Sequence, residues 1–377
     1  MADTTTETLS LTPLDALHRA LGGKMVPFAG YALPVNYPAG ILAEHQHTRA
    51  SASLFDVSHM GQVARRGAGA ATALETLLPG DIAGLGAGRM RYTFLTNERG
   101  GILDDLMVTH AGDHLFVVVN ASRKAEDIAH IAAGFAGKAT VEPLPDRALL
   151  ALQGPKAVDA LARLAPAVRD LDFLSGTALA VGGVHCFVTR SGYTGEDGFE
   201  LSVLAAHAEA LARRLLAEPE VKPAGLGARD SLRLEAGLCL YGHDIDETTT
   251  PVEAGLAWAI GKRRRASGGF PGDAVIRRQL AEGPARKRVG IRPAERAPAR
   301  EGTEITDGAG RVLGKVTSGG FGPTVGAPVA MGYVESKAAA EGTKLGLLVR
   351  GTERPAHVAA LPFVPHRYRR PASSKAS

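Results

Sequence analysis

Apolar and polar residues alternate in several short runs in the first part of the chain, and this period of two predicts β-strands. The strand-like runs are 91–97, 102–110 and 114–120. Asn97–Gly101 supplies a turn that joins the first two runs into a hairpin. The segments predicted to be helical are 41–52, 69–78 and 121–135. An earlier helix is expected to begin at Thr12, with its hydroxyl as the N-cap, and to stop at Gly22.

The second part of the chain continues this mixture of elements. Strands are predicted at 147–152, 184–190 and 198–203, and helices at 154–163, 206–217 and 226–236. Because the two kinds of element do not alternate strictly, the pattern predicts an α+β architecture. After Ile260 a basic, glycine-rich bridge leads to a short helix near 273–282. From Arg288 onward, short strand-like runs separated by Gly and Pro predict a small β-barrel or sandwich, so we expect a domain boundary here.

The composition is that of an ordinary soluble globular protein, with 45% hydrophobic and 22% charged residues in 377. This length suffices for two or three domains. The two cysteines, Cys186 and Cys239, lie far apart and in no metal-ligand spacing, which indicates a reducing compartment. The first 23 residues lack the pattern of a secretory signal, and no apolar run approaches the roughly 20 residues of a membrane span. We therefore expect a cytoplasmic protein that does not enter a membrane.

The net charge of +4 comes from basic residues concentrated late in the chain. Lys262–Arg265 and His366–Arg370 supply most of the excess. No zinc finger, helix-turn-helix or aromatic-interleaved strand accompanies them, so we expect no nucleic-acid partner. A solvated loop and a frayed terminus are the expected structures of these two segments. Attraction of an acidic protein partner or a polyanionic small molecule stays open as an alternative.

Most familiar catalytic motifs are absent. The G-x-G stretches that begin at Gly67, Gly84 and Gly225 do not continue to the third glycine of the dinucleotide motif G-x-G-x-x-G, and no phosphate-binding loop or G-x-S-x-G elbow occurs. His45 and His47 lie two positions apart on a predicted helix and point to different faces, and Ser58 beside His59 does not make a catalytic pair. The acidic cluster His243–Glu247 lacks a matching His/Cys set. Turn formation is its expected role, with magnesium binding as an open alternative.

Two adjacent carboxylates, Asp104 and Asp105, stand out inside the apolar run 102–110. A buried strand does not favour Asp, because each ionised carboxylate must be paired or solvated. Side chains alternate along a strand, so only one of the two can point into a given pocket. A shift of one residue in register exchanges the two faces, so spacing alone does not say which of the two acids points into the pocket. An edge strand with two solvated acids is the simplest interpretation.

Two other segments place polar groups in similar settings. In RSGYTGEDGFELSV (190–203) a loop presents Tyr193 before a strand that contains Glu200. On the predicted helix 226–236, Arg229 and Arg233 share one face, where their like charges repel unless an anion or acid offsets them. Arg is suited to holding a carboxylate through two parallel hydrogen bonds.

Together these segments resemble one family, the T-protein (aminomethyltransferase) of the glycine cleavage system. The matching segments, in order, are FAGYALPVNY (28–37), FDVSHMG (55–61), NERGGILDDLMV (97–108), LQGP (152–155), RSGYTGEDGFE (190–200), GLGARDSLRLEAGLCLYG (225–242) and VTSGGFGPTVG (316–326). The resemblance implies an α+β, three-domain clover-leaf fold, with two interleaved N-terminal α/β domains that form a folate site and a C-terminal β-barrel. It implies a folate-binding core at 10–265, with one subdomain at roughly 55–142, a barrel domain at 286–368 and a disordered tail at 369–377.

The resemblance also implies the reaction. An H-protein carries an aminomethyl group on the sulfur of its reduced lipoyl arm. The enzyme transfers the one-carbon unit to tetrahydrofolate and yields 5,10-methylenetetrahydrofolate, ammonia and the dihydrolipoyl H-protein. The resemblance implies that tetrahydrofolate is a co-substrate. Because no cofactor fingerprint occurs in the sequence, we expect no need for a metal, flavin or pyridoxal phosphate.

Residue by residue, the resemblance assigns Asp105 as the catalytic aspartate and Asp104 as its structural neighbour. It assigns folate binding to Tyr92, Asn120, Tyr193, Glu200 and Arg229. A pterin edge offers adjacent N–H donors, which a carboxylate such as Glu200 can accept in pairs. The chain departs from the usual family pattern at Tyr31, Leu33, His243 and Gly322.

Two alternatives of other classes share this fold. One is a non-enzymatic folate-binding protein that assists iron–sulfur cluster assembly, but its K-G-C-[YF]-x-G-Q segment is missing here. The other is a folate-dependent demethylation domain, which normally accompanies a flavin domain, and no flavin fingerprint occurs in this sequence.

Overall fold

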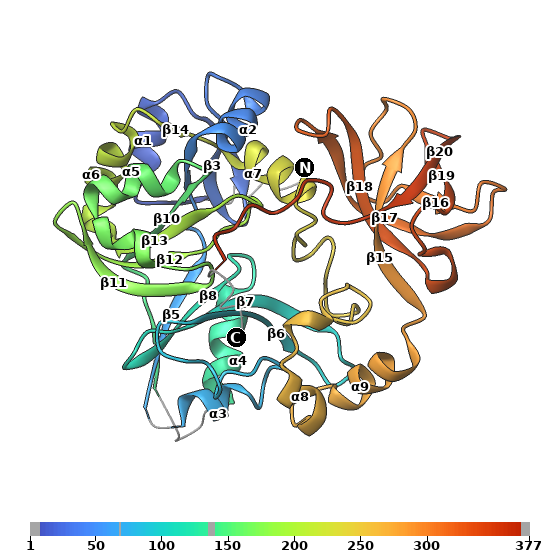
Figure 1. Cartoon of the computed structure of the whole chain (residues 1–377), viewed down its shortest axis with the longest axis horizontal. Helices are drawn as coiled ribbons and strands as arrows, with labels where there is room; N and C mark the ends of the chain where they lie inside the picture. The colour runs from blue at the N-terminus through green and yellow to red at the C-terminus, as the bar shows by residue number, and fades with distance from the viewer. Residues whose placement is uncertain (1–7, 68, 135–139, 371–377) are drawn as a thin grey trace, which may run out of the picture.

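The computed structural model describes residues 8–67, 69–134 and 140–370. Figure 1 shows two lobes of mixed sheet and helix and a third lobe that is a β-barrel. The predicted α+β class with a C-terminal barrel is therefore confirmed. The predicted domain bounds, 10–265 and 286–368, stay a prediction.

The first lobe is built on a six-stranded sheet whose inner strands come from distant parts of the chain. In spatial order its strands are β11 (Ser175–Val181), β12 (Val184–Arg190), β13 (Gly198–Leu204), β10 (Arg147–Gln153), β4 (Ala52–Asp56) and β14 (Val221–Pro223). Three helices bury apolar side chains against it: α1 (Asp15–Ala20), α5 (Ala157–Leu164) and α6 (Ala205–Leu216). A short helix, η1 (Pro166–Asp170), follows α5.

The second lobe is inserted between two neighbouring strands of the first. After β4 the chain forms a five-stranded sheet and returns at β10, which pairs with β4. The order of this sheet is β6 (Met90–Thr96), β7 (Ile102–His110), β8 (His114–Val119), β5 (Gly61–Arg66) and β9 (Thr140–Pro143). Its helices are α3 (Ala70–Leu74) and α4 (Lys124–Ala133). The two lobes are thus interleaved along the chain.

The hairpin predicted around Asn97–Gly101 joins β6 to β7. A side chain at Gly101 would bring its Cβ to 1.8 Å from the carbonyl oxygen of Glu247, so only glycine fits there. The start of β7 therefore packs closely against the loop that follows α7.

A three-stranded sheet and two further helices accompany the first two lobes. The sheet consists of β1 (Ser10–Leu11), β3 (Tyr31–Asn36) and β2 (Lys24–Phe28), and the helices are α2 (Ile41–Ala50) and α7 (Leu226–Glu235). The predicted N-cap at Thr12 is wrong: α1 begins at Asp15, and the Thr12 hydroxyl donates to Asp56 at 2.6 Å. A buried carboxylate competes successfully for that hydroxyl.

The bridge to the barrel contains η2 (Ala257–Ala259), α8 (Lys262–Ser267) and α9 (Asp273–Glu282). The loop expected at Lys262–Arg265 is wrong, because these residues begin helix α8; Arg264 is buried, whereas the other three are exposed, as expected. Arg264 is buried and donates to the Glu75 carbonyl, and Arg263 pairs with Glu75 and Asp81.

The third lobe is a closed barrel with the strand order β15-β18-β17-β16-β19-β20. Its strands are β15 (Arg286–Pro293), β16 (Glu304–Thr306), β17 (Val312–Gly322), β18 (Ala327–Glu335), β19 (Lys344–Val349) and β20 (Thr352–Ala359), with η3 (Ser336–Ala338) after β18. An apolar core of its own fills it.

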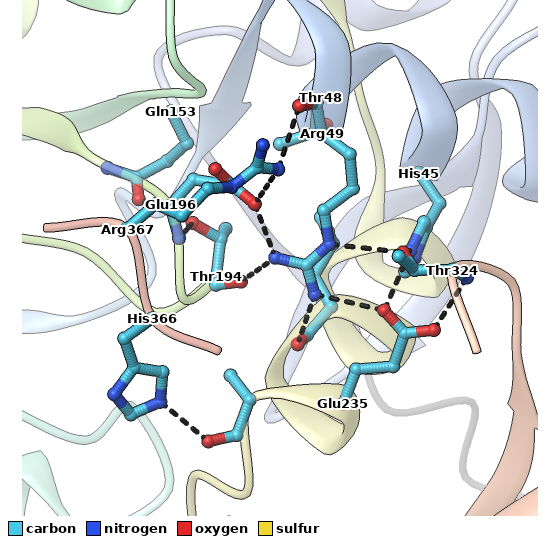
Figure 2. Close-up of polar contacts among 12 residues, drawn as sticks. His45, Thr48, Arg49, Gln153, Thr194, Glu196, Glu235, Thr324, His366 and Arg367 are labelled. Carbon is cyan, nitrogen blue, oxygen red and sulfur yellow. Dashed lines mark hydrogen bonds and ion pairs between the residues drawn. The ribbon is translucent and has the colours of Figure 1, made fainter. Parts of the chain in front are cut away.

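A buried ionic cluster, which we call the Arg49 cluster, ties the first lobe to the barrel (Figure 2). The Arg49 guanidinium on α2 donates to Glu196 at 2.8 Å and to Glu235 on α7 at 3.0 Å. Glu235 also accepts the backbone N–H of Thr324, from the turn between β17 and β18, at 2.7 Å. Arg49 further donates to the carbonyl of Thr194, so the cluster fixes the loop 191–197.

The frayed terminus expected at His366–Arg370 is wrong. Arg367 donates to Glu196 at 2.6 Å, and the ring of Tyr368 stacks on Phe173 with 4.0 Å between centroids. The carbonyl of Arg369 accepts the N–H of Phe173 at 2.9 Å. The rest of the predicted disordered tail, 371–377, lies outside the described residues. No helix in the described ranges is long and apolar enough to cross a membrane.

Candidate active site

The two aspartates of β7 face different surroundings, as the alternation along a strand requires. Asp104 lies on the inner face of the five-stranded sheet and is fully buried. Asp105 lies on the opposite face and is partly exposed. The register places Asp105 opposite Phe94 and one pair away from Tyr92 on the same face. Neither aspartate is a solvated edge residue, so the simplest interpretation of the sequence is wrong.

Asp105 is held by two neighbours. The hydroxyl of Tyr92 donates to its Oδ2 at 2.9 Å, and the side-chain amide of Asn120, at the end of β8, donates to its Oδ1 at 2.7 Å. Both bonds stabilise the ionised carboxylate.

The pKa of Asp105 is nevertheless high. Burial and the neighbouring charge of Asp104 together raise it to about 7, although the bonds from Tyr92 and Asn120 lower it. A carboxyl with this pKa is ionised or protonated with little change in free energy near neutral pH. Such a group in a partly open position is a candidate for chemistry.

A second wall comes from the loop 191–197, β13 and α7. The Arg229 guanidinium lies over the ring of Tyr193, 4.7 Å from its centroid. Glu200 accepts a hydrogen bond from the Ser191 hydroxyl at 3.0 Å. Burial raises the pKa of Glu200, while the charge of Arg229 and the Ser191 bond lower it. Glu200 and Arg229 are therefore close enough to stabilise each other.

The two walls belong to one site. Burial raises the pKa of Tyr193, and among the charges acting on it are those of Asp105 and Arg229. Each of the six residues chosen from the sequence is partly exposed and interacts with another of the six: Tyr92, Asp105, Asn120, Tyr193, Glu200 and Arg229. The structure thus brings all six together.

Trp258, which no sequence pattern singled out, lies at the same site. Its ring stacks on Tyr92, with 5.6 Å between centroids and 20° between planes, and 63% of the residue is exposed. It covers one face of Tyr92, so that face is not free for a ligand. Trp258 lies in no periodic pattern of the sequence. The feature that could have pointed to a role for it is that it is the single tryptophan of the chain.

His59 was also passed over, since its serine neighbour suggested no chemistry. It is buried against Phe28 and Tyr31. Burial lowers its pKa to about 4, and the charges of Arg229 and Lys124 contribute. His59 is therefore neutral at physiological pH and extends the polar surroundings of Arg229.

Arg233 does not share the open position of Arg229. It is buried and paired with Asp244 at 2.7 Å and with Asp230 at 2.8 Å. The acids that offset the charge of Arg233 on this helix are therefore side chains of the protein and not a ligand.

Asp244 belongs to the cluster His243–Glu247, for which magnesium binding was left open. Its carboxylate accepts bonds from Arg233 and from the hydroxyls of Thr317 and Ser318 on β17. It therefore joins α7 to the barrel. Within the described ranges, no group of three or more His, Cys, Asp or Glu side chains could hold a metal ion.

Comparison with known proteins gives matches over most of the chain. The family described as the GCVT N-terminal domain matches residues 14–264, and the glycine cleavage T-protein C-terminal barrel domain matches residues 286–365. "Aminomethyltransferase, mitochondrial" of Gallus gallus is 52% identical over 96% of this chain and 94% of its own length. The protein of the same name from Dictyostelium discoideum is 44% identical, with the same coverage.

A solved structure is similar throughout. The glycine cleavage system aminomethyltransferase T from Bartonella henselae has a TM-score of 0.91 and 45% identity, and the match covers 96% of this chain and all of that one. These findings support the transferase and neither of the two alternatives. The chain belongs to the glycine cleavage T-protein family and is an enzyme of the aminomethyltransferase type.

Proposed function

We propose that this enzyme transfers a one-carbon unit from an S-aminomethyl dihydrolipoyl group on an H-protein to tetrahydrofolate. The observation that carries this proposal is the raised pKa of Asp105, a carboxyl held between Tyr92 and Asn120 in a partly open site. The transfer forms two bonds from the methylene carbon to folate nitrogens and breaks its bonds to sulfur and to the amino nitrogen. Ammonia and the dihydrolipoyl thiol are released.

Glu200 and Arg229 fit the polar ends of a folate. Glu200 has one donor in Ser191, which leaves acceptor capacity for the adjacent N–H groups of a pterin edge. Arg229 lies beside it with one face on Tyr193 and offers N–H donors to an anionic or polar group. We assign both residues to folate binding, together with Tyr92, Tyr193 and Asn120.

Asp105 is assigned to the chemical step. As ammonia leaves, positive charge develops on the methylene carbon and its new nitrogen partner. A carboxylate fixed in a poorly solvated position stabilises such a charge more strongly than water does. Asp105 in its ionised form supplies this charge, and Tyr92 and Asn120 favour that form. The rate should therefore rise with pH and level off above about pH 7.

The decisive experiment is methylene transfer with a lipoylated H-protein that carries the aminomethyl group, followed by release of ammonia and formation of 5,10-methylenetetrahydrofolate. Tetrahydrofolate binding is measured separately through the fluorescence of Trp258, since it is the single tryptophan and stacks on Tyr92. Trp258→Phe is the control for the optical signal. Folate binding without any transfer would contradict the proposal and favour the non-enzymatic alternative.

Two further expectations stay predictions. We expect no requirement for a metal, flavin or pyridoxal phosphate, and activity that a chelator abolishes and a divalent ion restores would contradict this.

The cytoplasmic location has no support from the relatives, several of which are named mitochondrial. Cell fractionation with antibodies against the chain decides the location.

A further inference from the structure

A pair of buried carboxyl groups lies directly behind the proposed active site. Asp104 on β7 and Asp127 on α4 are 0% and 2% exposed. Their side chains are hydrogen-bonded to each other. Two carboxylates repel each other and have no donor, so this bond requires that one of the two groups holds a proton.

The surroundings decide which group holds the proton. Asp104 accepts the backbone N–H of Asn120 at 3.0 Å and its side-chain amide at 2.9 Å, and two such donors favour the ionised form. In the described part of the chain, no N–H or O–H group reaches Oδ2 of Asp127. Asp127 is therefore the protonated partner, and Asp104 is the carboxylate.

The charged groups around Asp127 agree with this assignment. Burial raises its pKa to about 10, and Asp104 from β7 and Glu126 from its own helix act in the same direction. Arg123 acts against them. Asp127 also acts on Tyr241, from the loop after α7, whose own pKa is raised mainly by burial, so that its hydroxyl stays neutral.

Asn120 connects this pair to the active site. Its side-chain nitrogen lies 2.9 Å from Oδ1 of Asp104, 2.7 Å from Oδ1 of Asp105 and 3.1 Å from the Asp105 carbonyl oxygen. An amide can also turn over and present its oxygen, which would repel the Asp105 carboxylate. A charged Asp104 prevents this because its carboxylate has no donor: it accepts the amide N–H and repels the amide oxygen.

We infer that Asp127 is a positioning residue of the transferase: as a neutral acid it donates to Asp104 and keeps it a carboxylate, which holds the amide of Asn120 toward Asp105. The chain of bonds runs from Asp127 through Asp104 and Asn120 to Asp105 and Tyr92. This inference rests on the proposed function, in which the Asp105 carboxylate stabilises the developing cation.

Substitutions at Asp127 separate its hydrogen bond from its packing. Asp127→Asn keeps an N–H donor toward Asp104, whereas Asp127→Leu keeps similar volume and has no donor. In the leucine variant Asp104 takes up a proton, which loosens Asn120 and removes the Asp104 charge. Loss of this charge lowers the pKa of Asp105 more than loss of the Asn120 bond raises it. The exposed neighbour Glu126 provides a matched control, since Glu126→Gln removes a carboxylate from the same helix.

The measurement is the pH dependence of kcat for methylene transfer. For Asp127→Leu we expect kcat to fall roughly tenfold or more, as when a group that orients an active-site ligand is removed. The acid limb of the kcat profile of this variant should move to lower pH by about half a unit or more, and its dissociation constant for tetrahydrofolate should hardly change. Asp127→Asn and Glu126→Gln should keep the wild-type profile. An unmoved acid limb in the leucine variant, or equal losses in the asparagine and leucine variants, would overturn the inference.

A second measurement applies even if the leucine variant does not fold. Infrared difference spectra of wild type against Asp127→Asn at neutral pH should show the C=O band of one protonated carboxylic acid in the wild type only. Absence of this band would overturn the inference whatever the activity. If Asp105→Asn keeps full activity while the band is present, the proposed role of Asp105 fails and the proton on Asp127 still stands.

Discussion

The Arg49 cluster and the group around Asp105 both bury carboxylates, and they do so in opposite ways. In the Arg49 cluster, Glu196 and Glu235 share the Arg49 guanidinium, and Arg367 adds a second cation beside Glu196. Around Asp105 the carboxyl groups are held by an amide, a phenol hydroxyl and one another. Burial opposes ionisation in both places, but in the first the carboxylates are paired directly with guanidinium groups.

The pKa values of the two groups reflect this difference. His45 and the N–H groups around Glu235 overcome its burial and lower its pKa to about 2. Burial and like charge raise the pKa of Asp105 to about 7 and that of Asp127 to about 10. A compensated carboxylate stays ionised and holds elements together, whereas a carboxyl group without such pairs can hold a proton near neutral pH. The predictions below test this division.

Removal of the shared cation should have the largest effect. Arg49→Leu leaves Glu196 and Glu235 buried beside fewer cations, and breaking a buried ion pair costs about 3–5 kcal/mol of unfolding free energy. Denaturant unfolding measures the loss. Arg213→Leu, which removes an exposed pair with Glu209, is the control and should change the stability little. Wild-type stability in Arg49→Leu would mean that the cluster is not what joins the first lobe to the barrel.

The next largest effect is expected at Asp105. Asp105→Asn keeps the shape and loses the charge, so turnover should fall roughly 10²-fold or more, as for single groups that stabilise a transition state. Tetrahydrofolate should bind nearly as before, because Glu200, Arg229 and Tyr193 are unchanged. Steady-state transfer and a Trp258 fluorescence titration give the two values. Normal turnover in this variant, with loss in Asp104→Asn, would exchange the roles of the two aspartates.

The protonated Asp127 should make stability depend on pH. Its pKa in the folded protein is about 10, against 3.8 as the ordinary value, so the folded state binds one more proton between these limits. The stabilisation that comes from this proton on Asp127 is fully present below pH 3.8 and is lost as the pH rises toward about 10. The slope is at most about 1.4 kcal/mol per pH unit. In unfolding series from about pH 5 to pH 9, Asp127→Asn should lose less stability than wild type, and equal slopes would contradict this.

The smallest effect is expected on α8. Arg263 is about half exposed and already paired with Glu75 and Asp81, so Arg263→Ala should change neither kcat nor stability appreciably. Association with the H-protein should keep its salt dependence for the same reason. A marked loss of association at low salt would show that this arginine attracts an acidic partner despite its pairs.

The sequence predicted the elements whose pattern is local. Helices α7 and α9 and the hairpin of β6 and β7 lie where periodicity and turn residues placed them. The small strands β1, β9 and β14 were missed, because each is short and is stabilised by a strand that is not its neighbour in the chain. The strand β2 was also missed, although it pairs with β3, which follows it directly. The helix α8 was missed for a related reason: its arginines are held by Glu75 and Asp81, some 180 residues earlier.

The site was accessible to sequence analysis mainly through resemblance. Alternation alone established that Asp104 and Asp105 face opposite sides, and it left open which is buried. That choice depends on the partner strands β6 and β8 and on α4, none of which follows from the spacing of the two acids. Trp258 and Asp127 were not recognised, since their roles arise from contacts with Tyr92 and Asp104 that no local pattern encodes.

The interleaving of the first two lobes sets an order for synthesis on the ribosome. The five-stranded sheet is continuous along the chain and can form as soon as β9 emerges, whereas the six-stranded sheet waits for β14. The bond from Arg367 to Glu196 spans 171 residues, so the loop that carries Tyr193 is fully fixed only after Arg367 has been translated. A chain interrupted in the barrel therefore holds the elements of the site without the contact that secures them, and quality-control proteases should recognise it as unfinished.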